Sequence, residues 1–484
     1  MRNLTLVMTA ACVASWLTAC SAPLPPASQA ERASAISVAV AAPVATPPSD
    51  FGSYATALSV FGDPAGQWSN FAANGVVPPT NPFFLALGSN KRTCGTCHNP
   101  NNGWTESPTN LNNRFTASNG NDPIFASIDG TNCPSLSTAT LAAHRTASSL
   151  LLTKGLIRIG LTPPNGAEFL VLAVNNPYGC TSQSQISVYR RISPTTNLGF
   201  LSNVMWDGRE SLTTSSVQQA LLTQASDAVT GHEAGAVAPT AATLSAIYNA
   251  EIPQFSAQTT LSTAGALNGT NAQGGVLTLP QQSFTPGSNN PFSGKAPIGV
   301  TPSPAFTLFS AWESLSGGNS ALLARASVGR GEKLFNSLPI TLTGVAGLND
   351  QVLNGKVLTT VTGTCATCHN APNAGSHTTS FLVNTGVAAA NVRTSDLPLI
   401  TLSNRATGGT VQTSDPGLAL TTGKWADIGK FKVPVLRNLS ARAPYFHNGS
   451  AATLDDVVNF YNARFAMKLT AQQHADLVAF LSAL

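Results

Sequence analysis

A Cys-x-x-Cys-His motif occurs twice in this chain of 484 residues, at positions 94–98 and 365–369. The spacing is typical of covalent attachment of c-type haem, because two thiols two residues apart match the two vinyl groups on one edge of the porphyrin. A zinc site built from two Cys-x-x-Cys pairs, or two separate redox dithiols, are alternatives, but neither requires a His directly after each pair. The sequence therefore predicts two covalent haems, each with its His as an iron ligand. The attachment residues are Cys94, Cys97, His98, Cys365, Cys368 and His369.

The first residues of the chain predict an export signal. Arg2 precedes an apolar run at positions 4–17, which is too short for a good membrane-spanning helix. The four residues that end at Cys20 look like a lipobox, so we expect a lipoprotein signal peptide at 1–19 and a lipid on Cys20. Ser21, in place of Asp, favours an anchor on the periplasmic side of the outer membrane. The alternative is an ordinary secreted signal peptide in which Cys20 has no role.

The composition of the chain indicates how the rest of it is organised and which partners it excludes. Residues 20–50 are mostly Ala, Pro and Ser with few apolar anchors, and we expect a tether there rather than a folded segment. Hydrophobic residues make up 43% of the chain, which is enough for the cores of two or more domains. A formal net charge of +4 is small for this length and argues against a nucleic-acid partner.

Two of the eight cysteines have no predicted place in the signal peptide, in lipidation or in haem attachment. These are Cys133 and Cys180. Disulfides form readily in the oxidising compartment that an export signal implies, so we expect these two residues to pair. Two separate buried thiols are the alternative.

Residue patterns predict three helices together with the positions at which they begin. Apolar residues share one helical face over 217–233, Thr453 begins a helix that runs through Tyr461, and Thr470 caps the last helix of the chain. The segment 236–320 contains no motif and is rich in Thr, Gly, Pro and Ser. We expect that segment to be an irregular excursion on the surface.

Three further blocks resemble a known family. Residues 205–210 resemble the Trp-Asp-Gly-Arg signature of bacterial dihaem cytochrome c peroxidases and of MauG-like enzymes. Residues 431–438 and 443–450 resemble two signatures of the C-terminal half of that family, with Asn448 where Asp is usual. The blocks and the two haem motifs follow one another in the family order.

The resemblance implies a mainly α fold, made of two cytochrome c-like haem domains that share an interface and carry long loop insertions. The N-terminal, peroxidatic domain would span residues 51–321, with an insertion at about 236–320. The C-terminal, electron-transfer domain would span residues 322–484. The likeness is clear at 200–235 and 322–484 and weak elsewhere.

The resemblance also implies roles for individual residues. In the family, hydrogen peroxide reacts at the N-terminal haem, the C-terminal haem handles electrons, and the signature Trp lies between them. Here these roles fall to the haems on His98 and His369 and to Trp206. An aromatic ring between two redox centres shortens each electron-transfer step and can itself lose an electron. A buried core aromatic is the alternative interpretation of Trp206.

Peroxide cleavage requires a group that takes a proton from the bound oxygen and returns it to the leaving oxygen. The family places a Gln and then a Glu in the distal pocket of the reactive haem. The matching pair here is Gln224 and Glu233, or Gln219 and Glu233, and His232 is a further candidate. The alternative is a solvated helix end in which His232 and Glu233 have no catalytic role.

The second axial ligand of the C-terminal haem is predicted to be Tyr461. Many family members use a Met that follows the Phe-His motif by fourteen residues, and counting from His447 gives Tyr461, as in MauG-like members. Met467, six residues later, is the nearest Met and the competing candidate. A thioether raises the haem potential, whereas a hard, anionic phenolate favours the ferric and higher states.

Calcium between the two domains is a family trait and a candidate second cofactor. Pro444 occupies one family ligand position, through its carbonyl oxygen, and Arg442 stands where the family commonly has Thr. Arg191 and Ile192 fall near the position of the ligating Asn.

The leading hypothesis is an enzyme that reduces hydrogen peroxide with electrons from a small periplasmic redox protein. Three alternatives are kept: MauG-like oxidation of a side chain on a protein partner, an electron-transfer cytochrome without catalysis, and an oxygenase that uses O₂.

Overall fold

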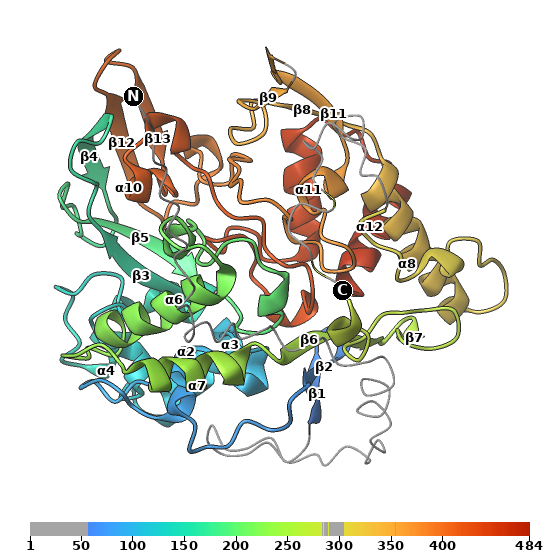
Figure 1. Cartoon of the computed structure of the whole chain (residues 1–484), viewed down its shortest axis with the longest axis horizontal. Helices are drawn as coiled ribbons and strands as arrows, with labels where there is room; N and C mark the ends of the chain where they lie inside the picture. The colour runs from blue at the N-terminus through green and yellow to red at the C-terminus, as the bar shows by residue number, and fades with distance from the viewer. Residues whose placement is uncertain (1–56, 283, 285–288, 290–303, 354) are drawn as a thin grey trace, which may run out of the picture. The chain divides into compact units, whose positions relative to one another are not determined.

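The computed structural model of the protein describes residues 57–282, 284, 289, 304–353 and 355–484 (Figure 1). The described residues all belong to one compact unit. The predicted signal peptide, the predicted lipidation site Cys20 and the predicted tether lie outside the described residues. None of the helices in the described part of the chain is both long and apolar enough to cross a membrane.

The described residues mix helices and strands, with 32% helix and 18% strand, so helix is the larger part but the prediction of a mainly α fold left out much of the strand. The helices are α2 (Cys94–Cys97), α3 (Pro108–Ala117), α4 (Leu141–Ala147), α5 (Ser149–Lys154), α6 (Val217–Gly231), α7 (Ala241–Glu251), α8 (Ser320–Ser337), α9 (Cys365–Cys368), α10 (Ala419–Thr422), α11 (Leu454–Arg464) and α12 (Ala471–Ser482). The strands are β1 (Leu58–Asp63), β2 (Gly66–Ala72), β3 (Leu156–Leu161), β4 (Phe169–Asn175), β5 (Ile186–Arg191), β6 (Gln254–Leu261), β7 (Gly265–Ala266), β8 (Ile340–Thr343), β9 (Val352–Leu353), β10 (Lys356–Val357), β11 (Thr360–Gly363), β12 (Leu399–Asn404) and β13 (Thr410–Thr413).

The segment 236–320 is partly regular, in contrast to the irregular excursion that we expected. It contains α7 and also β6, which pairs with β2 in an antiparallel sheet of order β1-β2-β6-β7. Strand β6 is polar, and its side chains find buried partners across the sheet: the Gln254 side-chain oxygen accepts a hydrogen bond from the Asn70 amide at 3.0 Å. A strand that is stabilised by partners far away in the sequence does not need alternating apolar and polar residues. The sequence therefore gives no pattern by which such a strand could be identified.

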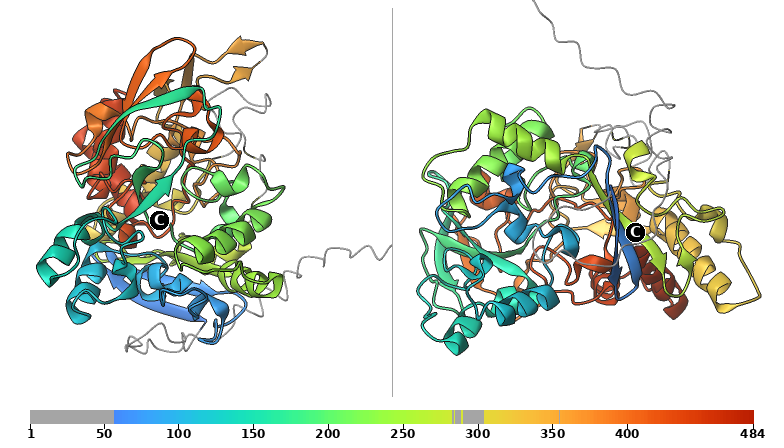
Figure 2. Two further views of the ribbon diagram at one scale, coloured as in Figure 1. Left: turned by 90° about the vertical axis from the view of Figure 1, so that its left-hand side faces the viewer. Right: turned by 90° about the horizontal axis from the view of Figure 1, so that it is seen from below.

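One sheet joins the two halves of the chain. Strand β4 pairs antiparallel with β12, which pairs with β13, so the sheet order is β13-β12-β4. The three strands lie side by side in Figure 1, and the left view of Figure 2 shows the same sheet from the side. Phe169 on β4 and Ile400 on β12 are buried in one apolar cluster with Ile186 on β5. The segments predicted as two domains therefore share a sheet and a core, and the predicted boundary at 321 and 322 falls inside α8.

The C-terminal helices pack closely around aromatic side chains. Phe335 on α8 and Phe480 on α12 are buried together, with ring centroids 5.5 Å apart. Gly331 permits this approach, since a Cβ there would lie 2.0 Å from the Asp476 carbonyl oxygen of α12. The predicted capping residues are confirmed, because Thr453 and Thr470 each close a capping box at the first turns of α11 and α12. The third predicted helix is confirmed as α6.

Cys133 and Cys180 are joined by a disulfide, with Cα atoms 5.7 Å apart. The bridge links the loop that precedes α4 to the loop between β4 and β5. It closes a chain segment with a sequence separation of 47 residues.

The disulfide should contribute strongly to stability. In the chain-entropy account, a loop of this length stabilises the folded state by about 4 kcal/mol. A Cys133→Ser, Cys180→Ser double variant should therefore lose about that much free energy of unfolding in denaturant titrations of the holoprotein. Ser182→Ala, a neighbouring change in the same loop, serves as the control. A double variant as stable as this control would show that the bridge adds no net stability.

Candidate haem sites

Each haem motif forms a single helical turn. In α2 the side chain of Thr93 accepts a hydrogen bond from Thr96 N–H, and the Thr96 hydroxyl accepts one from Thr93 N–H, which closes a capping box. At α9 the Thr367 hydroxyl likewise accepts a hydrogen bond from Thr364 N–H, at 2.8 Å. A single turn places the two Cys residues, three positions apart, on one face. The motifs thus take the same local conformation, with each His directly after the turn.

The first motif borders a cavity of about 130 Å³. Cys94, Cys97 and His98 line it together with apolar side chains of α6, α7 and β3. Burial lowers the pKa of His98 to about 4, although the backbone of Trp104 acts in the other direction. The imidazole is therefore neutral, which is the form that binds metal. Two thiols and a neutral His facing an apolar cavity fit a covalent haem.

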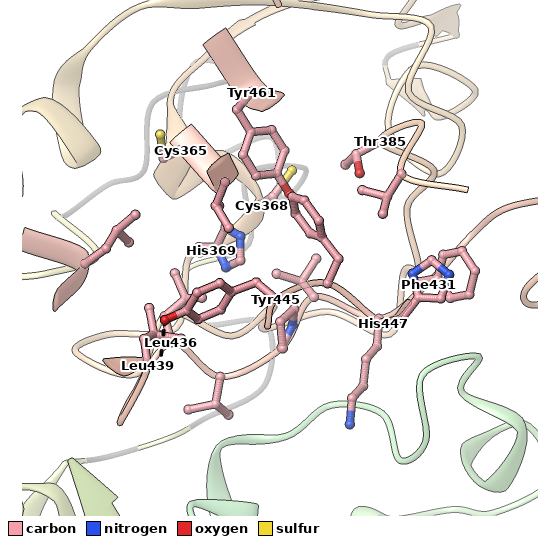
Figure 3. Close-up of a pocket in the computed structure, with 18 of the residues that line it drawn as sticks. Cys365, Cys368, His369, Thr385, Phe431, Leu436, Leu439, Tyr445, His447 and Tyr461 are labelled. Carbon is pink, nitrogen blue, oxygen red and sulfur yellow. Dashed lines mark hydrogen bonds between the residues drawn. The ribbon is translucent and has the colours of Figure 1, made fainter. Parts of the chain in front are cut away.

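The second motif borders a larger and mostly apolar cavity of about 280 Å³. Cys365, Cys368 and His369 line it (Figure 3). Nδ1 of His369 donates a hydrogen bond to the Gly375 carbonyl oxygen at 2.6 Å. This bond orients the ring and leaves Nε2 as the metal-binding atom. Burial lowers the pKa of His369 to about 4, so this site also fits a haem.

Both candidates for the second ligand lie in the wall of the larger cavity. Tyr461 on α11 and Met467 just after it line the cavity. Figure 3 shows His369 and Tyr461 extending from separate helices toward the same space. Burial raises the pKa of Tyr461, and Thr385, which is within hydrogen-bond reach, opposes that shift. A buried phenol of this kind becomes a phenolate only beside a cation such as iron.

A second tyrosine in the same wall was not singled out from the sequence as a site residue. Tyr445 lines the larger cavity, and its hydroxyl donates to the Leu439 carbonyl oxygen at 3.0 Å (Figure 3). The larger cavity thus presents two phenols, Tyr445 and Tyr461, each with a hydrogen-bond partner in the chain.

Trp206 lies in the walls of both cavities. Its indole Nε1 donates to the Arg191 carbonyl oxygen at 2.8 Å, and its own carbonyl accepts from Lys432 N–H at 2.8 Å. The Lys432 amine lies 6.0 Å from the ring centroid. Burial lowers the pKa of Lys432 to about 8, and nearby Asp207 partly offsets that effect. One hydrogen bond thus fixes the indole and another fixes the main chain of Trp206, and the residue borders both cavities.

A buried ion-pair network fixes the segment that carries Trp206. Arg190 is 1% exposed and bonds Asp207 at 2.6 Å and Asp415 at 2.7 Å. Burial would raise the pKa of Asp207, but Arg190 and Arg209 outweigh it and hold the pKa at about 2. The signature Asp-Gly-Arg therefore serves mainly to anchor the residue that precedes it.

The predicted distal residues are brought to the first cavity. Gln224, His232 and Glu233, at the C-terminal half and end of α6, all line it. Gln219 is exposed and is not among the residues that line the cavity, which favours the pair with Gln224.

His232 has a carboxylate partner that the sequence did not reveal. Its Nδ1 lies 2.5 Å from the Asp129 carboxylate, which also pairs with Arg92. Burial would raise the pKa of Asp129, but His232 and Arg92 together lower it. An ionised carboxylate only accepts hydrogen bonds, so Nδ1 of His232 is the donor in this contact, and Nε2 is the ring nitrogen that Asp129 does not engage.

Two acids differ in their surroundings. The Glu233 carboxylate accepts from Leu87 N–H at 3.0 Å and lies 3.6 Å from the Cys94 sulfur. Glu251, the last residue of α7, also lines the first cavity and was missed from the sequence, where no motif surrounds it. Burial raises the pKa of Glu251 to about 8, so it keeps its proton at neutral pH.

The residues at the predicted calcium position do not fit calcium. The Arg442 carbonyl oxygen already accepts a hydrogen bond from the Arg191 guanidinium at 3.1 Å. No group of three or more His, Cys, Asp or Glu side chains that could hold a metal ion occurs among the residues that the structure describes.

No family model matches the chain. It is 33% identical over 159 residues to cytochrome-c peroxidase IdrP1 of Denitromonas iodatirespirans, which covers 29% of this chain and 41% of that protein. It is 35% identical over 153 residues to IdrP2 of the same organism, again over 41% of that protein. The cytochrome c551 peroxidase of Nitrosomonas europaea is 41% identical over 64 residues, 19% of its length. The match thus spans about two fifths of the length of the first two relatives.

Among solved structures, a MauG-like protein associated with microbial copper homeostasis aligns over 83% of this chain and 87% of its own, with 15% sequence identity and a TM-score of 0.31. This score is too low to decide the fold.

Proposed function

Because this chain is a distant homologue of the bacterial dihaem cytochrome c peroxidases, we propose that it is a c-type dihaem oxidoreductase that reduces hydrogen peroxide. The observation that carries the proposal is the position of Trp206 in the walls of two cavities, each bordered by a Cys-x-x-Cys-His turn. Peroxide would be reduced in the first cavity. Electrons would pass between the haem on His98 and the haem on His369 through Trp206.

Reduction of H₂O₂ to two water molecules takes two electrons and two protons. When bound, the haem on His98 would supply the redox chemistry at the first cavity. The chain supplies the proton transfers, and His232 is the best-placed base because Asp129 holds its Nδ1 and leaves Nε2 to accept a proton. Glu251 is a proton donor at neutral pH, and Gln224 and Glu233 complete the polar wall.

The same geometry suits oxidation of a protein side chain. A Tyr461 phenolate would be a hard, anionic ligand that favours high oxidation states of the second haem. A haem ligated in that way stores oxidising equivalents better than it donates electrons at low energy. MauG-like oxidation of a partner protein is therefore the second candidate, favoured by the place of Tyr461 in the wall of the larger cavity.

The location and partners are part of the proposal. Export and lipidation at Cys20 would place the protein on the periplasmic side of the outer membrane. There a small periplasmic redox protein would supply electrons to the second haem. A cytochrome without catalysis would not react with peroxide, and an oxygenase would consume O₂ with an organic substrate.

The proton-transfer role of His232 tests the proposed reaction. We expect His232→Ala to slow the reaction of the oxidised holoprotein with H₂O₂ by roughly 10²–10⁴-fold in stopped-flow measurements. Asp129→Asn should slow it by about 10-fold or more, because an amide no longer fixes the imidazole tautomer. Gln219→Ala, an exposed change on the same helix, is the control. If His232→Ala reacts as fast as this control, another group transfers the proton.

The ligand role of Tyr461 is tested by its redox effect. Tyr461→Met replaces a hard, anionic ligand with a soft thioether. The potential of the second haem should rise by about 0.1 V or more, within the roughly 0.8 V that axial ligands span. Spectroelectrochemistry measures this change, with Met467→Leu as the control for the competing candidate. An unchanged potential in Tyr461→Met, together with a shift in Met467→Leu, would assign the ligand to Met467.

A further inference from the structure

Arg191 is a buried arginine without a carboxylate partner within ion-pair distance in the described part of the chain. It ends β5 and is 5% exposed. Its guanidinium is instead surrounded by main-chain oxygens. Nη1 donates to the Lys154 carbonyl at 2.9 Å, and Nη2 donates to the Arg442 carbonyl at 3.1 Å, with the Ala443 carbonyl at 3.5 Å. A set of buried carbonyl oxygens is the environment in which proteins commonly hold a hard cation.

The surrounding backbone is shaped to accept the guanidinium. Gly155 follows α5 with φ of +62°, and a Cβ added there would lie 1.9 Å from Arg191 Nη1. Any other residue would therefore collide with the side chain. The space that a cation would need is already filled by this guanidinium.

The backbone of Arg191 joins the elements around the two cavities. Its N–H donates to the His447 carbonyl at 2.6 Å, and its carbonyl accepts from the Trp206 indole at 2.8 Å. Arg191 also lines both cavities. Thus one residue connects the indole, the segment 442–447 of the C-terminal half, and the end of α5.

Local charge excludes a divalent cation at this place. The Arg191 guanidinium already brings one positive charge to these carbonyl groups. The nearest acid that acts on Arg191 is Glu106, which is already paired with Arg114 at 2.5 Å. A calcium ion would therefore meet the Arg191 guanidinium and no free carboxylate, and like charges at such distances repel strongly in a buried site.

We propose that the Arg191 guanidinium replaces the calcium ion that the resembled family holds between its haem domains, so that this protein joins its two haem cavities without a metal. Arg191 acts here as a positioning residue for Trp206 and the segment 442–447. The proposal concerns how the cavities are joined, and it does not depend on the reaction that the haems carry out.

The direct test is the calcium content and thermal stability of the holoprotein. Elemental analysis of the purified wild type should find well under one calcium per chain, and neither EGTA nor added Ca²⁺ should change its Tm. About one calcium per chain, or a Tm that falls in EGTA, would overturn the proposal. Both readouts are independent of peroxide reactivity, so they remain informative if the proposed function is wrong.

Arg191→Asn reverses the replacement, because it removes the cation, opens space beside the carbonyl oxygens and offers an amide oxygen. Its Tm should fall by roughly 5 °C. Added Ca²⁺, but not Mg²⁺, should restore most of this loss, since Ca²⁺ accepts irregular oxygen coordination more readily. Arg158→Asn is the matched control, because this β3 arginine also donates to a main-chain carbonyl, that of Ile128.

Two results with the variants would contradict the proposal. In the first, Arg191→Asn is as stable as Arg158→Asn. In the second, Arg191→Asn is destabilised and Ca²⁺ has no more effect on it than Mg²⁺, which would make the guanidinium an ordinary packing group.

Discussion

The buried ion pairs of Arg190 with Asp207 and Asp415 are the interaction on which the arrangement of the site depends. Asp207 directly follows Trp206, and Asp415 comes from the C-terminal half, so a single guanidinium ties the indole segment to the other half of the chain. Removing one partner of a buried pair leaves the other charge uncompensated, which typically costs about 3–5 kcal/mol. The network therefore specifies one position for Trp206 between the cavities and penalises others.

Arg191, the next residue, also holds separate segments of the chain together, but it bonds different groups. Arg190 binds carboxylates, whereas Arg191 binds the carbonyl oxygens of Lys154 and Arg442. Consecutive residues of one strand point to opposite faces, which explains why two neighbouring arginines reach separate environments. Together they attach β5 to both halves of the protein, and the shared sheet of β4 and β12 strengthens that attachment.

Local features of the site could be predicted from the sequence, and distant ones could not. The haem turns, the caps Thr453 and Thr470, and the cavity positions of Trp206 and Tyr461 follow from motifs in which the informative residues are close together or at fixed spacings. In contrast, Asp129 meets His232 across 103 residues. No periodicity or spacing marks such a contact, because the fold alone brings the two groups together.

The same reason explains why the predicted fold left out much of the strand. Helices are stabilised by neighbours three and four positions away, so caps and periodic faces reveal them. Strand β6 pairs with β2 across a large part of the chain and has polar side chains that bond across the sheet, as between Gln254 and Asn70 at 3.0 Å. Because the predicted fold relied on resemblance to a helical family, it underestimated the amount of strand.

Electron paramagnetic resonance of the oxidised holoprotein can show whether Trp206 couples the two proposed haems. Spectra would be recorded before and after one equivalent of hydrogen peroxide, for the wild type and for Trp206→Phe. We expect both ferric haem signals to decrease together in the wild type, whereas in Trp206→Phe the signal of the second haem should persist. A second-haem signal that is unaffected in the wild type, or lost equally fast in Trp206→Phe, would show that Trp206 does not couple the haems.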